Sequence, residues 1–180
     1  TLILDDTGNV NITAEDVDNG SNDACGIANL SLDITAFDCT NLGLNDVLLT
    51  VTDANGNQNT CTATITVEDN IPPTVVATND ITTTTSADDF GDCDTDVFIP
   101  NAVLDDNCES NLTWVMTGDV IANGIGQVET YTFPVGTTTI TYTNTDSSNN
   151  TATDFMTVTV SDDEVPTISC APSQSQTTDA

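Results

Sequence analysis

The sequence reads Val67-Glu68-Asp69-Asn70-Ile71-Pro72-Pro73-Thr74, and 93 residues later it reads Val160-Ser161-Asp162-Asp163-Glu164-Val165-Pro166-Thr167. The same spacing aligns Asp53-Ala54-Asn55-Gly56-Asn57 with Asp146-Ser147-Ser148-Asn149-Asn150. An ungapped self-match of this length is typical of tandem modules. Each copy of the first stretch ends an alternating segment, presents acidic or amide side chains and then becomes proline-containing. We therefore predict an acidic hinge between two β modules.

The composition limits the possible partners of this chain. Its 180 residues include 29 Asp and Glu but no Lys, Arg or His, so the formal net charge is −29. Nothing in it can neutralise phosphate, which excludes nucleic acid, and the same repulsion excludes an anionic membrane surface. Such a charge opposes a compact fold unless counter-ions are held, and divalent cations suit that role.

Apolar residues alternate with polar ones along most of the chain, for example at Val47, Leu49 and Val51, and turn residues interrupt the alternation about every ten positions. This pattern has period two and predicts strands, with no helical period. We predict an all-β fold of two tandem immunoglobulin-like β-sandwiches joined by an acidic, proline-containing linker. Trp114 is expected in the core.

The repeat also predicts the domain boundaries. Residues 1–72 form the first module, which lacks its first strand, and residues 73–166 form the second. Residues 167–180 then provide the first strand of the next unit, or are donated to it. The missing strand and the extra segment are complementary.

Several motifs together resemble hyalin-repeat modules, with the closest resemblance to those in large surface adhesins of Bacteroidota. They are the Asp106-Asn107-Cys108 loop, the stretch Phe133–Thr139, the Asp53–Asn57 turn and the Pro-Thr module starts. The resemblance covers nearly the whole chain. It implies a secreted or cell-surface protein of many immunoglobulin-like modules without enzymatic activity.

The resemblance also implies a disulfide pattern. The family usually carries four cysteines per module, two of them on the first and last strands, where the second module has Ala77 and Asp154 instead. The pattern therefore implies the bonds Cys25–Cys39, Cys93–Cys108, and Cys61 with Cys170 of a neighbouring unit. The alternative is that Cys61 and Cys170 are both unpaired. Disulfides require an oxidising compartment, which agrees with an extracellular chain.

Acidic and amide residues cluster in loops that an immunoglobulin-like fold brings to one end, together with the incoming linker. Calcium takes six to eight oxygen ligands from such groups, so we expect Ca²⁺ at these ends. The candidates at the first module are Asp16, Asp18, Asn19, Asp23, Asp53, Asn55 and Asn57. Those at the linker and second module are Asp69, Asn70, Asp105, Asp106, Asn107, Asp146 and Asn149. Asp162, Asp163 and Glu164 would cap the next unit. The alternative is that these are turn-forming and solvated residues. No organic cofactor is expected.

Glycosylation is a further possibility that the sequence leaves open. Asn-x-Ser/Thr sequons occur at Asn11, Asn19, Asn29, Asn111 and Asn149. They also arise by chance in a chain rich in Asn and Thr, so covalent glycans are one interpretation of two.

Enzyme chemistry has little support, because the chain has no His to act as a base and no Lys or Arg to stabilise an anion, and we expect no catalytic residues. Our main hypothesis is an extracellular structural protein, the repeat unit of a calcium-stiffened, disulfide-stapled filament or adhesin stalk. Its partners would be copies of itself, head to tail, in a filament or a longer tandem chain. The alternatives are a glycan- or partner-binding adhesin module and a spacer module of a secreted enzyme.

Overall fold

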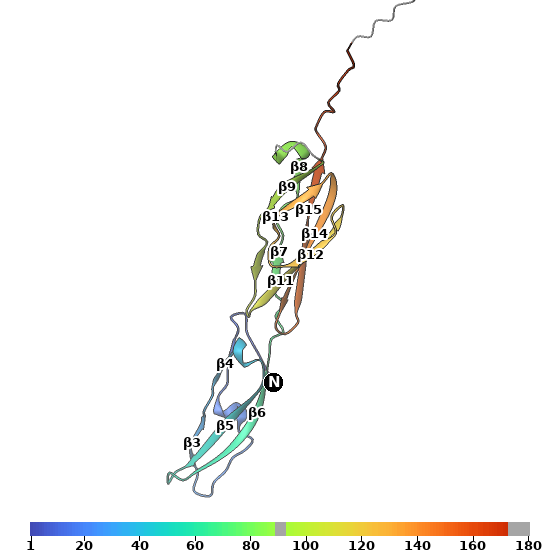
Figure 1. The fold of residues 1–180 in the computed structure, drawn as a ribbon. Helices are drawn as coiled ribbons and strands as arrows, with labels where there is room; N and C mark the ends of the chain where they lie inside the picture. Colours follow the sequence, from blue (N-terminus) through green and yellow to red (C-terminus); the bar gives the residue numbers. More distant parts are fainter. Residues whose placement is uncertain (89–92, 173–180) are drawn as a thin grey trace, which may run out of the picture.

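The computed structural model describes residues 1–88 and 93–172, and nearly all of its regular elements are β-strands. The strands pair in two groups separated by residues 69–73, and Figure 1 shows these groups end to end. We call residues 1–68 the first module, residues 74–161 the second module and residues 69–73 the linker. The predicted all-β fold class is confirmed. The domain boundaries stay predictions, and residues 173–180 of the proposed last segment lie outside the described residues.

The first module has a four-stranded sheet in the order β1-β6-β5-β3 and a two-stranded sheet of β2 and β4. Its strands are β1 Leu2–Ile3, β2 Asn9–Asn11, β3 Ile27–Leu32, β4 Ala36–Asp38, β5 Gly43–Asp53 and β6 Gln58–Glu68. A 3-10 turn, η1, covers Cys39–Asn41. The buried core consists of Leu4, Ile12, Phe37, Val47 and Val67.

One prediction for this module was wrong. The period-two pattern predicted strands and no helix, but β2 ends at Asn11 and a four-residue helix, α1, covers Ala14–Val17. Thr13 and Asp16 satisfy each other's backbone N–H groups in a capping box, which stabilises a helix start that a period-two pattern does not reveal.

The second module has a five-stranded sheet in the order β12-β11-β14-β15-β8 and two pairs, β13-β9 and β10-β7. Its elements are β7 Thr74–Val76, β8 Ile81–Thr84, η2 Thr85–Asp88, β9 Asp94–Ile99, β10 Val103–Asp105, β11 Ser110–Gly118, β12 Ala122–Ile125, β13 Glu129–Pro134, β14 Gly136–Asp146 and β15 Thr151–Ser161. Alternate residues of β14 are buried, among them Ile140 and Tyr142, which is the pattern of a strand with one face in a core. Trp114 lies at the edge of this core, half-buried and edge-on to Tyr131.

The strand registers make the two modules directly comparable. β3, β5 and β6 pair with one another as β11, β14 and β15 do, and β1 lies parallel to β6 as β8 lies parallel to β15. β7 has no counterpart among the described residues of the first module. Because β7 carries the buried Val75, the first module presents a less complete core than the second.

Candidate functional site at the joint between the modules

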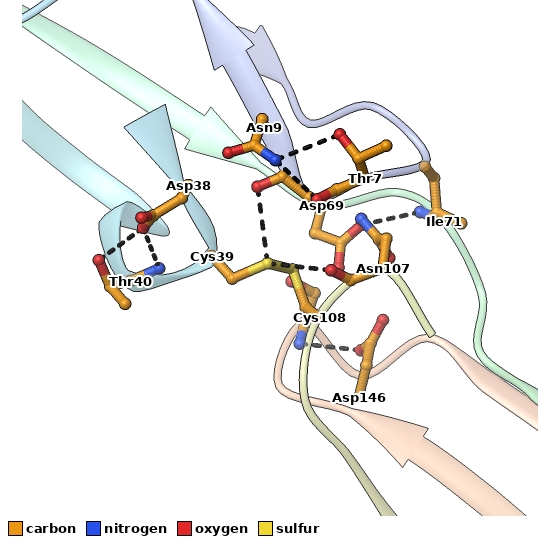
Figure 2. Close-up of a disulfide and its surroundings, with 12 residues drawn as sticks. Thr7, Asn9, Asp38, Cys39, Thr40, Asp69, Ile71, Asn107, Cys108 and Asp146 are labelled. Atoms are coloured by element: carbon orange, nitrogen blue, oxygen red, sulfur yellow. Dashed lines mark hydrogen bonds between the residues drawn. A yellow bond between two sulfur atoms is a disulfide. The ribbon is translucent and has the colours of Figure 1, made fainter. Parts of the chain in front are cut away.

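A disulfide joins the two modules. Cys39 follows β4 in the first module, Cys108 precedes β11 in the second, and their Cα atoms are 5.7 Å apart. Figure 2 shows this bond beside the linker, which enters from β6. The pairings Cys25–Cys39 and Cys93–Cys108, implied by the family resemblance, are therefore wrong. In the described part of the chain, the cysteines without a disulfide are Cys25, Cys61, Cys93 and Cys170, all exposed.

The length of the modules explains why those two pairings fail. Cys25 lies beside the turn that joins β5 to β6, because the backbone N–H of Ala54 donates to the carbonyl of Gly26. Cys39 lies at the other end of the same module, since its Sγ is 3.7 Å from the carbonyl oxygen of Gly8. Strands of 11 residues at about 3.3 Å per residue separate these ends by about 35 Å, far beyond the reach of a disulfide. Cys93 and Cys108 likewise lie at opposite ends of the second module, too far apart for a disulfide.

The linker is held from both sides. Nδ2 of Asn107 donates to Oδ1 of Asp69 at 3.1 Å and to the carbonyl of Asp5 at 3.3 Å, so one side chain contacts the linker and the first module. Nδ2 of Asn150 donates to the carbonyl of Asp69 at 3.1 Å. The backbone N–H of Ile71 also donates to Oδ1 of Asp69. Asp69 is only 3% exposed as a result.

Several oxygen atoms at the joint are buried without a hydrogen-bond partner of normal geometry. They are Oδ2 of Asp69, both carboxylate oxygens of Asp106 and Oδ1 of Asn107. Burial raises the pKa of Asp106, and the nearby charges of Asp146 and Asp69 raise it further, while the N–H groups of Asn107 and Cys108 offset this only in part. Buried, unsatisfied carboxylate oxygens are costly in a chain that has no cationic side chain to pair with them.

A small hollow of about 180 Å³ adjoins these groups. It is lined by Asp6, Ile71, Pro72, Thr74, Asp105, Asp106 and Asn107. Carboxylate, amide and carbonyl oxygens are the ligands that Ca²⁺ takes. Within residues 1–88 and 93–172, however, no three Asp, Glu, Cys or His side chains form a preassembled metal site. An ion here would need amide, carbonyl or water oxygens to complete its shell.

The predicted ligands of this joint separate into three kinds. Asp69, Asp106 and Asn107 lie together with unsatisfied oxygens. Asp146 is buried nearby, but its carboxylate already accepts hydrogen bonds from Ser148 and Asn150. Three others are exposed: Asn70, Asp105 and Asn149.

Sequence reasoning missed Asn150 as a residue of the joint. Its side chain holds both Asp146 and the linker. The signal was present, because Asn57 occupies the same place in the first repeat, where its Nδ2 donates to Oδ2 of Asp53 at 2.7 Å. Asn149 has the same residue type and a sequon, but it adopts a positive φ of 69° and points to solvent as an exposed turn residue.

The candidates of the first module are mostly engaged in their own turns. Asp16 accepts from Thr13 in the helix cap, Asp18 from Gly20 and Ser21, Asp23 from Cys25, and Asp53 from Asn55 and Asn57. These hydrogen bonds lower the pKa of Asp16, Asp18 and Asp53, with the largest contribution from Thr13, Ser21 and Asn57 respectively. Asn19 is exposed. This end of the first module thus shows satisfied turn residues rather than orphaned oxygens.

The acidic group after β15 repeats the linker turn. The backbone N–H of Glu164 donates to Oδ1 of Asp162 at 3.0 Å, as that of Ile71 does to Asp69. Asp163 instead turns back and accepts from the backbone and hydroxyl of Ser86, and the hydroxyl bond lowers its pKa. Asp162 is exposed, unlike its buried counterpart Asp69.

The five sequon asparagines are all exposed, so their positions are accessible. Among the described residues, no helix is long and apolar enough to cross a membrane.

Strand order and register define a protein of immunoglobulin-like tandem repeats, here with a disulfide across the joint between them. No protein-family model matches the chain. The chain is 32% identical over 157 residues to hyalin of Strongylocentrotus purpuratus, an alignment that covers 83% of this chain and 12% of hyalin. It thus spans about an eighth of the length of that relative. This similarity supports an immunoglobulin-like repeat, and a bacterial origin stays a prediction.

Three solved structures are similar at low identity. The fibronectin(III)-like modules of Clostridium thermocellum CbhA align at 12% identity with a TM-score of 0.37, covering 95% of each chain. Extracellular cadherin domains 1–4 of protocadherin gamma B7 align at 11% and 0.33, covering 77% of this chain and 42% of that one. The IG1+IG2 pair of DIP-gamma aligns at 11% and 0.28, covering 73% and 70%. The fold assignment rests on the strand topology.

Proposed function

We propose that this chain is an extracellular structural protein, a repeat unit of a filament or adhesin stalk whose joints are stiffened by calcium and stapled by disulfides. The observation that carries the proposal is the joint itself. A covalent bond crosses it, Asn107 bridges the linker and the first module, and buried carboxylate oxygens remain unsatisfied beside them. A flexible connection between independent domains needs none of these features.

Calcium is proposed as the ion because the unsatisfied groups are all hard oxygen donors. The ion would contact Asp106 and Oδ2 of Asp69, with Oδ1 of Asn107 as a neutral ligand. It would offset the burial and the nearby negative charges that together raise the pKa of Asp106. Because the ligands come from the linker and from the second module, the bound ion would restrict the angle between the modules.

Copies of the chain are proposed to assemble head to tail. In the second module, the carbonyl of Thr74 accepts from Nδ2 of Asn144, and the backbone N–H of Ala77 donates to Asp154. The repeat places Val51 and Cys61 of the first module where Asn144 and Asp154 lie. There the structure has a groove of about 250 Å³ lined by Ser21, Asn22, Val51, Asn59, Thr60 and Cys61.

The same repeat aligns Thr167–Cys170 with Thr74–Ala77. Cys170 therefore takes the place of Ala77, which faces the position of Cys61. We propose that residues 167–170 of one copy, or the corresponding residues of a longer tandem chain, lie in this groove as an added strand and bring Cys170 to Cys61. Repeated contacts of this heterologous kind produce open filaments.

The proposed alternative, a glycan- or partner-binding module, would need an exposed aromatic platform. Phe98 and Phe155 are exposed, but they belong to different sheets, so they do not form one. We propose no catalytic site.

The test is thermal unfolding and small-angle scattering in calcium and in chelator, with magnesium as the control for general charge screening. One ion that binds only the folded joint stabilises it by about 2.7 kcal/mol at 100 times its dissociation constant. The proposal expects a higher melting temperature and a narrower distribution of lengths in calcium than in magnesium. Equal behaviour in both salts and in chelator would refute the calcium joint.

A further inference from the structure

Each module carries a cysteine at the same corner of its fold, where a pair of strands ends, although the 93-residue repeat does not align these two cysteines with each other. In the first module, Asn9 of β2 pairs with Asp38 of β4, and Gly8 and Cys39 lie just beyond that pair. In the second module, Asp94 of β9 pairs with Pro134 of β13, with Cys93 and Val135 just beyond. Cys93 thus occupies the place of Gly8, and Val135 the place of Cys39. The backbone N–H of Val135 donates to the carbonyl of Cys93 at 3.1 Å, which confirms that the two face each other.

A side chain at the place of Gly8 would reach the disulfide. A Cβ added to Gly8 would lie 2.7 Å from Sγ of Cys39 and 2.4 Å from the carbonyl oxygen of Asn107. The place of Gly8 therefore lies directly against the staple between the modules and against the loop that carries Cys108. Cys93 has this position at the outer end of the second module.

The other half of the staple also has a counterpart. Ser110 pairs with Asp146 at the start of β11, and Ile27 pairs with Asp53 at the start of β3. Cys108 lies two residues before Ser110, in a loop that begins at Asp106. Cys25 lies two residues before Ile27, in a loop that begins at Asp23. Cys25 therefore occupies, at the outer end of the first module, the place that Cys108 occupies at the joint.

The surroundings of Cys93 are open for such a partner. A hollow of about 370 Å³ lies beside it, lined by Cys93, Asp162, Glu164, Val165 and Pro166. These last residues repeat the linker and its turn. At the joint, the loop that carries Cys108 lies beside the linker and Cys39. The hollow beside Cys93 has the equivalent position at the outer end of the second module, where a loop of the next copy would lie.

We propose that Cys93 and Cys25 form a second inter-module disulfide, from the outer end of one copy to the first module of the next. This inference rests on the head-to-tail assembly proposed above and names the covalent bond of that joint. Two thiols become one disulfide, and their two electrons and two protons reduce a small-molecule disulfide such as oxidised glutathione to two thiols. Each joint of the filament would then carry one staple of the same kind as Cys39–Cys108.

The test uses the full chain with the double substitution Cys61→Ser and Cys170→Ser, which leaves Cys25 and Cys93 as the exposed thiols. In calcium and a glutathione redox buffer, non-reducing gels are expected to show a ladder, and digestion at acidic residues followed by mass spectrometry is expected to yield the Cys25–Cys93 peptide. Adding Cys93→Ser or Cys25→Ser is expected to abolish the ladder. Serine is a close match in size at these exposed positions, so folding is unaffected.

The unsubstituted chain separates the two proposals. Cys61–Cys170 bonds together with free, alkylatable Cys25 and Cys93 would overturn this inference and leave head-to-tail assembly standing. A monomer with all four thiols free would overturn both. Symmetric bonds, Cys93–Cys93 or Cys25–Cys25, would also overturn the inference, because they join like ends.

Discussion

Asn107 donates from Nδ2 to Oδ1 of Asp69 at 3.1 Å, and this bond connects the loop that carries Cys108 to the linker. The disulfide and the hydrogen bond are made by adjacent residues, so one loop holds the first module covalently and the linker electrostatically. Oδ1 of the same asparagine has no partner and lies among carboxylates. The joint is therefore held by covalent and hydrogen bonds but incompletely satisfied, and we expect its unpaired oxygens to respond to ions and pH.

Asn150→Ala is expected to destabilise the joint. Its side chain donates to the linker carbonyl of Asp69 and to Asp146, whereas the equivalent Asn57 donates only within its own turn, to Asp53. With hydrogen bonds worth about 1 kcal/mol each, Asn150→Ala should cost roughly 1 kcal/mol more than the matched variant Asn57→Ala. Urea unfolding of the two variants measures the difference. Equal losses would mean that the contact with the linker contributes nothing.

Asp106→Asn is expected to change the response to pH and to calcium. Because the pKa of Asp106 is raised in the folded state, the folded chain holds this proton more tightly than the unfolded chain. In chelator, stability should therefore fall as pH rises from 3.8 through the raised pKa, and the variant should lack this fall. At neutral pH in chelator the variant should melt higher than the unsubstituted chain, but it should gain less from calcium.

Asp23→Asn is the matched control, since Asp23 has the equivalent place at the exposed outer end of the first module. It should leave the gain in stability from calcium unchanged. If Asp106→Asn and Asp23→Asn behave alike, Asp106 is not part of an ion site. Carboxylates with a lowered pKa, such as Asp53, act in the opposite direction and lose their stabilising effect as pH falls. Subtracting the curves of the two variants removes that contribution.

The repeat was sufficient to predict which loops meet at the joint. Asp69, Asp106 and Asp146 belong to the linker, the loop before β11 and the turn before β15, and any immunoglobulin-like topology brings these to one end. The disulfide was not predictable in the same way. Cys25 and Cys39 are close in sequence, yet they lie at opposite ends of a long module, and strand pairing alone determines the end at which each cysteine lies.

Whether a given carboxylate is buried at the joint could not be predicted from the sequence either. Asp53 and Asp146 occupy equivalent turns and make the same hydrogen bonds, but only Asp146, at the joint, is buried. Composition alone cannot distinguish a satisfied turn residue from an ion ligand, because the difference depends on what packs against the turn.

Cys39→Ser is expected to loosen the connection between the modules without unfolding either one. The closed loop spans 69 residues, for which the loop-entropy model gives about 4 kcal/mol. Cys39 and Cys108 pack against the core of the first module, but neither is one of its fully buried residues, and neither contacts the core of the second module. Distance measurements between a fluorophore on each module should broaden, and the melting temperature should fall. Cys25→Ser, at an exposed cysteine without a disulfide, should change neither property in the monomer. An unchanged distance distribution in Cys39→Ser would show that hydrogen bonds and ions alone hold the joint.

A peptide of residues 165–172 is expected to bind the groove of the first module and, under oxidising conditions, to bond through Cys170 to Cys61. The repeat equates Ile168 with Val75, which is 8% exposed in the second module, and Ser169 with Val76, which is 56% exposed. Ile168→Asp should therefore abolish binding, because it places a charge where a core side chain belongs, whereas Ser169→Asp should bind nearly as well as the unchanged peptide. Fluorescence anisotropy of a labelled peptide, with Cys170→Ser to remove the covalent step, measures the non-covalent affinity. If both aspartate peptides lose binding equally, charge repulsion from this acidic chain explains the result and the strand register is wrong. If neither loses binding, the groove does not receive the segment as a strand.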